Sequence, residues 1–249
     1  MLAQGRPPTE SWFSRFITEF ILCGCICDPK GAKGPPLTND EEEFLEALRG
    51  FMERPFDSSN ADHMNIIFSI WRNLSPESEL PPPVDPRWKK LGFQSANPVT
   101  DIRTGLHSVE SLEYLSKQYP LEFRRMVSEA SNPQSEYPFA ASALSIAFLL
   151  IMFFRLNKRT GVNPVGSPSG SRAALKQFIR LSLVNRNFFD EVFCVVVRRV
   201  HNEWMGQPGG HFDIHYFATA LGIGMNAVAE FFNEKRIREL SDLELILKI

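Results

Sequence analysis

The chain has 249 residues, of which 43% are hydrophobic, and a formal net charge of −2 at pH 7, which suits one globular domain with a substantial core. Basic residues do not outnumber acidic ones and no zinc-finger or ribonucleoprotein motif is present, so nucleic acid is excluded as an expected partner. Four cysteines make no disulfide framework and no secretory signal precedes them, which predicts a cytoplasmic protein.

Residues 1–37 are predicted to be a tail and one amphipathic helix outside the main domain. Apolar residues recur at helical spacing over residues 12–21. Three cysteines follow at alternate positions: Cys23, Cys25 and Cys27. One interpretation is a membrane-surface helix with an S-acylation cluster, peripheral to endomembranes; the other is a helix docked on the core with buried thiols. No fourth ligand at a zinc spacing accompanies the cysteines, so no metal site is predicted.

Two amphipathic helices are predicted next. Thr38 and Glu41 have the spacing of a capping box, and the apolar residues of 44–52 fall on one face of the helix that follows. The same periodicity predicts a helix over Ala61–Leu74. A run of three prolines then indicates an exposed connector.

The stretch from Trp88 to Leu112 carries the strongest functional signal. Pro98 fixes its own φ and biases the residue before it towards extended backbone. Gly92 and Gly105 permit backbone conformations that a side chain forbids, so the middle of this stretch should not be helical. An ordered loop of this length in a compact domain is usually functional.

Residues 100–103, Thr-Asp-Ile-Arg, predict a tight turn that presents one arginine. The Thr100 and Asp101 side chains can accept hydrogen bonds from backbone amides, and the Asp101 carboxylate lies within reach of the Arg103 guanidinium. Such an arginine either braces the structure or meets a phosphate or carboxylate in a fork geometry. The residues alone leave both interpretations open, and a structural ion pair is the commoner of the two.

The fixed spacing W-x3-G-F-Q-x3-P-x-T-D-I-R resembles the signature of the ELMO-domain family. The matching positions are Trp88, Gly92, Phe93, Gln94, Pro98, Thr100, Asp101 and Arg103, continued by Gly105, Leu112 and Tyr114. In stand-alone members of that family, the equivalent arginine is the arginine finger of a GTPase-activating protein for Arf and Arf-like GTPases. The family usually reads R-G-x-G from the arginine onward, whereas this chain reads Arg103-Thr104-Gly105, which predicts a shorter and stiffer loop.

The resemblance implies an ELMO-like helical domain over residues 38–235, with residues 236–249 as a C-terminal extension. It implies that Arg103 acts in trans on the GTP form of an Arf or Arf-like GTPase, while Asp101 orients Arg103. Gln94 and Thr100 would shape the loop. The expected structural anchors are Trp88, Gly92, Phe93, Pro98 and Gly105. The alternative is a non-catalytic adaptor that binds a GTPase or an exchange factor; neither function requires a cofactor on this chain.

The apolar run Phe139–Phe154 predicts a buried helix at the centre of a single compact all-α domain. With about sixteen residues it is shorter than the roughly twenty that a membrane span needs. No strand alternation is evident anywhere. Further helices are predicted over Val109–Gln118, Leu121–Glu129 and Phe188–Met205, and over Phe212–Phe232 with a break near Gly222 or Gly224.

Two further patterns concern charge and metal binding. Ser171 is predicted to cap a helix whose basic residues share one face: Arg172, Lys176 and Arg180. Such a stripe is ordinarily a solvated face, and the other interpretation is contact with an acidic partner or anionic lipid. His211 and His215 are four residues apart, but without the Glu of an H-E-x-x-H motif they predict no metal site.

Overall fold

The computed structural model describes residues 36–157, 171–206 and 214–233, and within these ranges all regular structure is helical. The α-helices are α2 (Asn39–Met52), α3 (Ala61–Leu74), α4 (Leu106–Gln118), α5 (Pro120–Ala130), α6 (Phe139–Phe153), α7 (Arg172–Val184), α8 (Phe188–Met205) and α9 (Ile214–Asn233). Two short 3-10 helices, η1 (Pro86–Leu91) and η2 (Pro98–Asp101), lie between α3 and α4. The predicted all-α fold class is confirmed.

Three predictions fall outside the described residues. These are the N-terminal amphipathic helix with its cysteines, the C-terminal extension over residues 236–249, and His211. No helix within the described ranges is long and apolar enough to cross a membrane.

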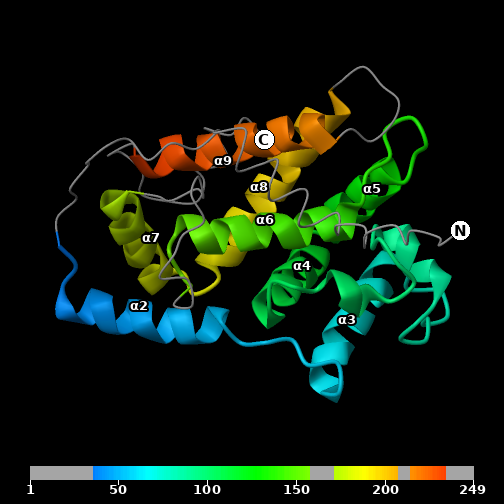
Figure 1. Ribbon diagram of the computed structural model, residues 1–249, viewed down its shortest axis with the longest axis horizontal. Coiled ribbons are helices and arrows are strands. Elements are labelled where there is room, and N and C mark those ends of the chain that lie inside the picture. Colours follow the sequence, from blue (N-terminus) through cyan, green and yellow to red (C-terminus); the bar gives the residue numbers. More distant parts are fainter. Residues whose placement is uncertain (1–35, 158–170, 207–213, 234–249) are drawn as a thin grey trace, which may run out of the picture.

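Helix α6 is the centre of the fold. In Figure 1 it runs through the middle of the molecule, with α9 along one side and α2, α3 and α4 along the other. Every residue of α6 except Phe148 is buried, and α4, α5 and α8 all pack against it. A helix that is apolar on all sides is stable in water only when neighbours surround it. The predicted central helix is therefore confirmed.

The predicted capping signals place the starts of two helices. Thr38 Oγ1 accepts a hydrogen bond from the Glu41 amide at 3.3 Å, and Glu41 Oε2 accepts one from the Thr38 amide at 2.9 Å. This reciprocal pair is the predicted capping box at the start of α2. Ser171 Oγ accepts from the Ala174 amide at 3.1 Å and starts α7 in the same way.

Helix α9 corrects one prediction, because it continues through Gly222 and Gly224 without a break. A Cβ added at Gly224 would lie 2.8 Å from Cγ2 of Val200 on α8. The glycine thus allows α8 and α9 to approach closely, and packing of the two helices offsets the roughly 1 kcal/mol that glycine costs inside a helix.

The basic face of α7 corrects another prediction. Lys176 is buried: its Nζ donates to the Pro36 carbonyl at 2.7 Å and pairs with Glu41 Oε2 at 3.2 Å. Arg180 Nε lies 3.2 Å from Glu41 Oε1. Burial alone would raise the pKa of Glu41, but hydrogen bonds from Thr38, Lys176 and Arg180 hold that pKa below its ordinary value. The prediction is therefore wrong at Lys176, which is buried in an ion network that joins α7 to α2, whereas Arg172 and Arg180 are exposed.

Candidate functional site

The candidate site is the arginine loop, residues 85–105, which contains η1, η2 and Arg103. Its first fixed point is Trp88, whose side chain is fully buried. The indole Nε1 donates to the Pro82 carbonyl at 2.9 Å, so the one polar atom of the ring is satisfied. The ring contacts three aromatic neighbours, with centroid distances of 5.5 Å to Trp71, 6.2 Å to Phe68 and 6.3 Å to Phe93. This cluster holds the loop on α3.

Two Asx-Pro steps start the two short helices of the loop. Asp85 Oδ1 accepts from the Arg87 amide at 2.8 Å, and Asn97 Oδ1 accepts from the Val99 amide at 3.1 Å. The proline after each cap presets φ for the first helical turn. The Asp85 amide also donates to the Ala96 carbonyl at 2.8 Å, which ties the two turns together. These caps were not predicted from the sequence, although an Asp-Pro and an Asn-Pro pair are both typical of a turn that starts a short helix.

Gly92 fixes the loop against the start of the central helix. Its φ is +91°, in the left-handed region that favours glycine. A Cβ at this position would lie 2.3 Å from the Phe139 amide nitrogen and 2.8 Å from that of Ala140. The Ala141 amide donates to the Gly92 carbonyl at 3.3 Å. The end of η1 is thus in direct backbone contact with α6, and no side chain fits between them.

Gly105 fixes the other end of the loop against Arg54, in the segment that follows α2. Its φ is +92°, and a Cβ there would lie 3.0 Å from the Arg54 carbonyl oxygen. That same oxygen accepts from the Leu106 amide at 2.9 Å. The Arg54 guanidinium lies 3.9 Å from the centre of the Phe51 ring and pairs with Glu110 Oε2 at 2.6 Å. Gly105 and Leu106 therefore dock the end of the arginine loop on the Arg54 backbone.

Hydroxyl groups hold the interior of the loop. Thr100 Oγ1 donates to the Asn97 carbonyl at 2.8 Å and lies 2.9 Å from Ser95 Oγ. Ser95 Oγ in turn donates to the Asn97 carbonyl at 2.9 Å and accepts from the Asn97 amide at 3.0 Å. Ser95 and Asn97 were not singled out from the sequence, because their role depends on which groups the turn brings together.

Asp101 faces the loop and Arg103 faces solvent. Asp101 Oδ2 accepts from the Gln94 amide at 2.7 Å, while the Gln94 side chain is exposed. Burial raises the pKa of Asp101, and the charge of Arg103 acts against that rise. Arg103 Nε donates to the Thr100 carbonyl at 3.4 Å. Asp101 therefore stabilises the turn that precedes Arg103, and the two opposite charges attract each other.

The residues beside Asp101 and Arg103 hold the backbone of η2 in place. Pro98 is buried, and the side chains of Val99 and Ile102 pack against the core. Arg103 follows directly and is exposed. The alternation sends the apolar side chains of η2 inward and the Arg103 guanidinium outward.

A groove of about 850 Å³ borders the arginine loop at Phe93 and Gln94. Its lining includes the exposed side chains of Lys89 and Lys90, together with Arg124, whose Nε donates to the Asn73 carbonyl at 2.7 Å. Within this lining the cations outnumber the acidic residues, so the groove favours an acidic partner surface.

Comparison with known proteins identifies the family. The model of the ELMO/CED-12 family matches residues 46–217, more than half of the chain, and that span includes the whole arginine loop. The chain belongs to the ELMO/CED-12 family. The resemblance carried by Trp88, Gly92 and Arg103 is thereby confirmed at the level of the family.

Three relatives show the extent of the similarity. The chain is 25% identical to ELMO domain-containing protein C of Dictyostelium discoideum over 81% of this chain and 33% of the relative. It is 30% identical to ELMO domain-containing protein 2 of Mus musculus, over 52% of this chain and 42% of the relative. It is 23% identical to ELMO domain-containing protein 1 of Pongo abelii over 82% and 60%. The chain thus spans less than two thirds of these relatives, and no solved structure matches it.

Proposed function

We propose that this protein activates an Arf or Arf-like GTPase by inserting Arg103 beside the phosphates of the bound GTP. The observation that carries the proposal is an exposed arginine on a loop whose two ends are fixed by backbone contacts. Gly92 abuts α6, and Gly105 abuts the Arg54 carbonyl just after the end of α2. A loop backbone held in this way loses little conformational freedom when its arginine meets a partner.

The chemistry of GTP hydrolysis suits a single inserted cation. Negative charge is spread over the phosphoryl oxygens in the transition state, and an arginine supplied in trans accelerates hydrolysis by roughly 10³ to 10⁵. The planar guanidinium can contact two oxygens at once, which the point charge of a lysine cannot do. The GTPase supplies the magnesium and the residue that orients the attacking water, so Arg103 is the one group that this chain contributes to the reacting centre.

The groove beside the loop supports an acidic partner. Lys89 and Lys90 are exposed next to Gln94, where they would attract negative charge on a GTPase and align it with the loop. Electrostatic attraction of this kind acts mainly on the association rate. We therefore expect Lys89→Glu combined with Lys90→Glu to slow binding, with a smaller effect on hydrolysis once the complex has formed.

The test is single-turnover hydrolysis by a panel of GTP-loaded Arf and Arf-like proteins. Arg103→Ala should lower the stimulated rate by about 10³ or more, and Arg103→Lys should restore little of it. The matched control is Arg186→Ala, which removes an exposed arginine between α7 and α8 and should keep full stimulation. Thermal melts on the same samples separate catalysis from folding. Full stimulation by a folded Arg103→Ala protein would exclude the arginine finger.

The non-catalytic adaptor is the second candidate function, and the residue after the arginine favours it. Thr104 stands where the family usually has glycine, and its hydroxyl is buried without a hydrogen-bond partner among the described residues. An adaptor would bind the GTP form of a GTPase without changing its hydrolysis rate. Binding measured by interferometry on the samples from the turnover assay distinguishes the two functions.

We also propose that the protein is cytoplasmic and reaches endomembranes through residues 11–27. The support is the amphipathic pattern followed by Cys23, Cys25 and Cys27. Cell fractionation of the whole chain and of a variant with these three cysteines changed to serine tests it. Equal membrane recovery of both proteins would reject acylation as the anchor.

A further inference from the structure

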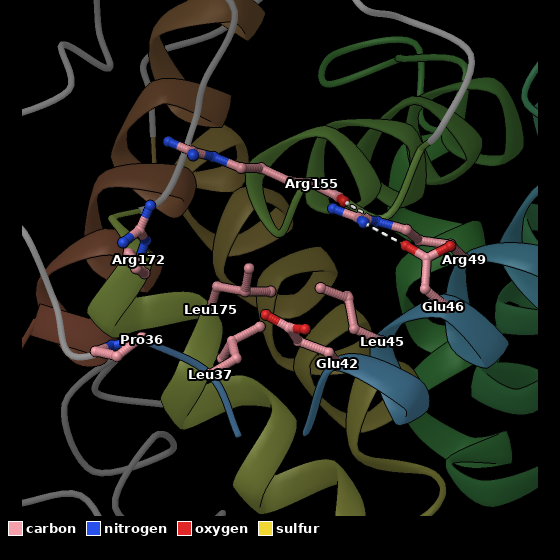
Figure 2. Close-up of a pocket in the computed structure, with 9 residues that line it drawn as sticks. All are labelled: Pro36, Leu37, Glu42, Leu45, Glu46, Arg49, Arg155, Arg172 and Leu175. Atoms are coloured by element: carbon pink, nitrogen blue, oxygen red, sulfur yellow. Dashed lines mark hydrogen bonds and ion pairs between the residues drawn. The ribbon is translucent and has the colours of Figure 1, made fainter. Parts of the chain in front are cut away.

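A second site lies between α2, the end of α6 and the start of α7. This α2–α7 pocket has a volume of about 420 Å³, and its charged lining consists of Glu42, Glu46, Arg49, Arg155 and Arg172. Figure 2 shows that the pocket floor between these charges is formed by leucine side chains, including Leu45 and Leu175. None of these residues belongs to the arginine loop.

Within the described ranges, Arg49 is the one arginine of the three that pairs with a carboxylate. Arg49 Nη1 pairs with Glu46 Oε1 at 2.7 Å, and Arg49 Nε donates to the Arg155 carbonyl at 3.0 Å. Among the described residues, no carboxylate lies within ion-pair distance of Arg155 or Arg172. In Figure 2 both of these guanidiniums lie on the same side of the pocket, away from the Glu46–Arg49 pair.

Arg155 occupies a backbone position that disfavours any side chain. Its φ is +54°, and it is the only residue other than glycine with positive φ in the described ranges. It ends α6 in a Schellman motif, in which the Leu156 amide donates to the Ile151 carbonyl at 2.9 Å and the Arg155 amide to the Met152 carbonyl at 3.0 Å. Glycine is the favoured residue there, because any side chain is strained at positive φ.

One hydrogen-bond donor of the Arg155 guanidinium is also unsatisfied. Its Nε is buried without a hydrogen-bond partner in the described part of the chain. An enclosed donor without an acceptor destabilises the folded state, because it has lost its hydrogen bonds to water. Neither the backbone nor the hydrogen bonds of the described residues thus account for arginine at this position.

Arg172 also stands where a cation is unfavourable. It is the first residue of α7, directly after the Ser171 cap, and it is exposed. The helix dipole is positive at this end, so a cation there costs several tenths of a kcal/mol. The other two basic residues of the stripe, Lys176 and Arg180, are paired with Glu41, which leaves Arg172 to face the pocket.

We propose that Arg155 and Arg172 bind the phosphate group of a phosphorylated polyol in the α2–α7 pocket. A phosphate dianion can accept from both guanidiniums and from the enclosed Nε–H after a small rotation of the side chain, and it offsets the helix-end repulsion at Arg172. Glu42 lines the opposite side of the pocket and can accept hydrogen bonds from hydroxyl groups, whereas it repels a second phosphate. The volume is that of a small-molecule site.

The polyol phosphate can be a free metabolite or the headgroup of a phosphoinositide lipid, because both present the same chemistry. The experiment uses the whole chain with inositol monophosphate in solution, and with phosphatidylcholine vesicles that contain or lack phosphatidylinositol phosphate. Sodium chloride at matched ionic strength is the reference for nonspecific salt effects. Binding is measured by titration calorimetry, by the rise in melting temperature and by vesicle flotation.

The decisive variant is Arg155→Gly. It should weaken binding of inositol monophosphate about tenfold or more, because it removes a charged hydrogen-bond donor. The same change relieves the positive-φ strain, so the unliganded protein should melt at a higher temperature and misfolding cannot explain the loss. Arg172→Gln should weaken binding similarly, whereas Arg72→Gln, an exposed arginine on α3, should leave it unchanged.

Two further variants make the outcome specific. Glu42→Gln should weaken inositol monophosphate binding while leaving the response to inorganic phosphate unchanged or stronger. Arg103→Ala should bind as wild type does, so this site is tested independently of the proposed GTPase activation. Vesicle binding that depends on Arg155 identifies a lipid headgroup as the source, and binding of the soluble probe alone identifies a free metabolite. Unchanged affinity of Arg155→Gly, or no response of wild type to either probe, would overturn the proposal.

Discussion

The arginine loop and the α2–α7 pocket both contain residues with positive φ, but the residue types at these positions differ. Within the described ranges positive φ occurs at Gly92, Gly105 and Arg155. In the loop the chain places glycine at both positions, and the functional candidate Arg103 lies between them without positive φ. At the end of α6 the chain keeps an arginine where glycine is favoured. The glycines of the loop allow close backbone contacts that hold it in place, whereas the arginine at the pocket keeps a side chain that lowers stability.

The largest expected change in stability is at Gly92, in the arginine loop. Gly92→Ala places a methyl group 2.3 Å from the Phe139 amide nitrogen and at a φ of +91°. Overpacking against backbone and the strained φ together should cost about 4 kcal/mol of unfolding free energy. Urea unfolding measures it. The control is Gly50→Ala on α2, where no atom lies within 4 Å of the added Cβ. That change should stabilise by about 0.5 to 1 kcal/mol, and equal effects at both glycines would contradict the contact with α6.

A smaller effect is expected at the other end of the loop. Gly105→Ala meets the Arg54 carbonyl oxygen at 3.0 Å and has the same φ penalty, so it should cost about 2 kcal/mol. Because the Arg54 contact positions the residues next to Arg103, the variant should also lose stimulated hydrolysis at temperatures where it remains folded. A folded Gly105→Ala protein with full stimulation would show that loop geometry does not matter for the arginine.

Replacing Arg155 at the α2–α7 pocket with glycine should increase stability. Arg155→Gly should raise the unfolding free energy by about 1 kcal/mol, whereas Arg155→Ala removes the same guanidinium but keeps the strained φ. The Arg49 contact survives in both variants, because it is made to the backbone carbonyl of residue 155. The difference between the two variants therefore isolates the backbone term. Equal stability of the glycine and alanine variants, measured by urea unfolding, would remove the argument that Arg155 is kept at a cost.

The smallest effect concerns pH and contrasts the loop with the helical body. His201 on α8 is buried; in its neutral form Nε2 donates to Glu129 Oε2 at 2.7 Å and Nδ1 accepts from the Tyr137 hydroxyl at 2.8 Å. Burial lowers the pKa of His201 below 6.5. The unfolded chain therefore binds the proton first, and stability falls as pH drops through the window below about 6.5.

Asp101 in the loop works in the opposite direction. Burial raises the pKa of Asp101 above 3.8, so the folded state binds the proton before the unfolded state does. Protonation of Asp101 at acid pH therefore increases the free energy of unfolding. Unfolding free energies between pH 7 and 5 should follow His201, and His201→Gln should flatten the slope. Asp101→Asn should leave the slope in that window nearly unchanged. A slope that persists in His201→Gln would assign the acid sensitivity to other groups.

Much of the architecture follows from local pattern. The bounds of α3 and α8 were predicted to the residue, because apolar side chains at helical spacing mark the buried face directly. The capping box at Thr38 and the cap at Ser171 are equally local, since a cap binds an amide only a few residues away. The arginine loop could be located for the same reason: prolines, glycines and the Thr-Asp pair act within one turn.

Tertiary structure decided what depends on residues far apart in the chain. The continuity of α9 through Gly224 requires Val200 as its neighbour, and the burial of Lys176 requires Glu41 on α2. Neither partner leaves a periodic signal, because periodicity reports which face is buried and not what lies against it. Nor does the sequence around Arg155 predict a left-handed backbone conformation there, since glycine is the residue that usually indicates one. The sequence by itself determined an all-helical domain with one presented arginine, and only the packing of α2, α6 and α7 placed two further arginines around one pocket.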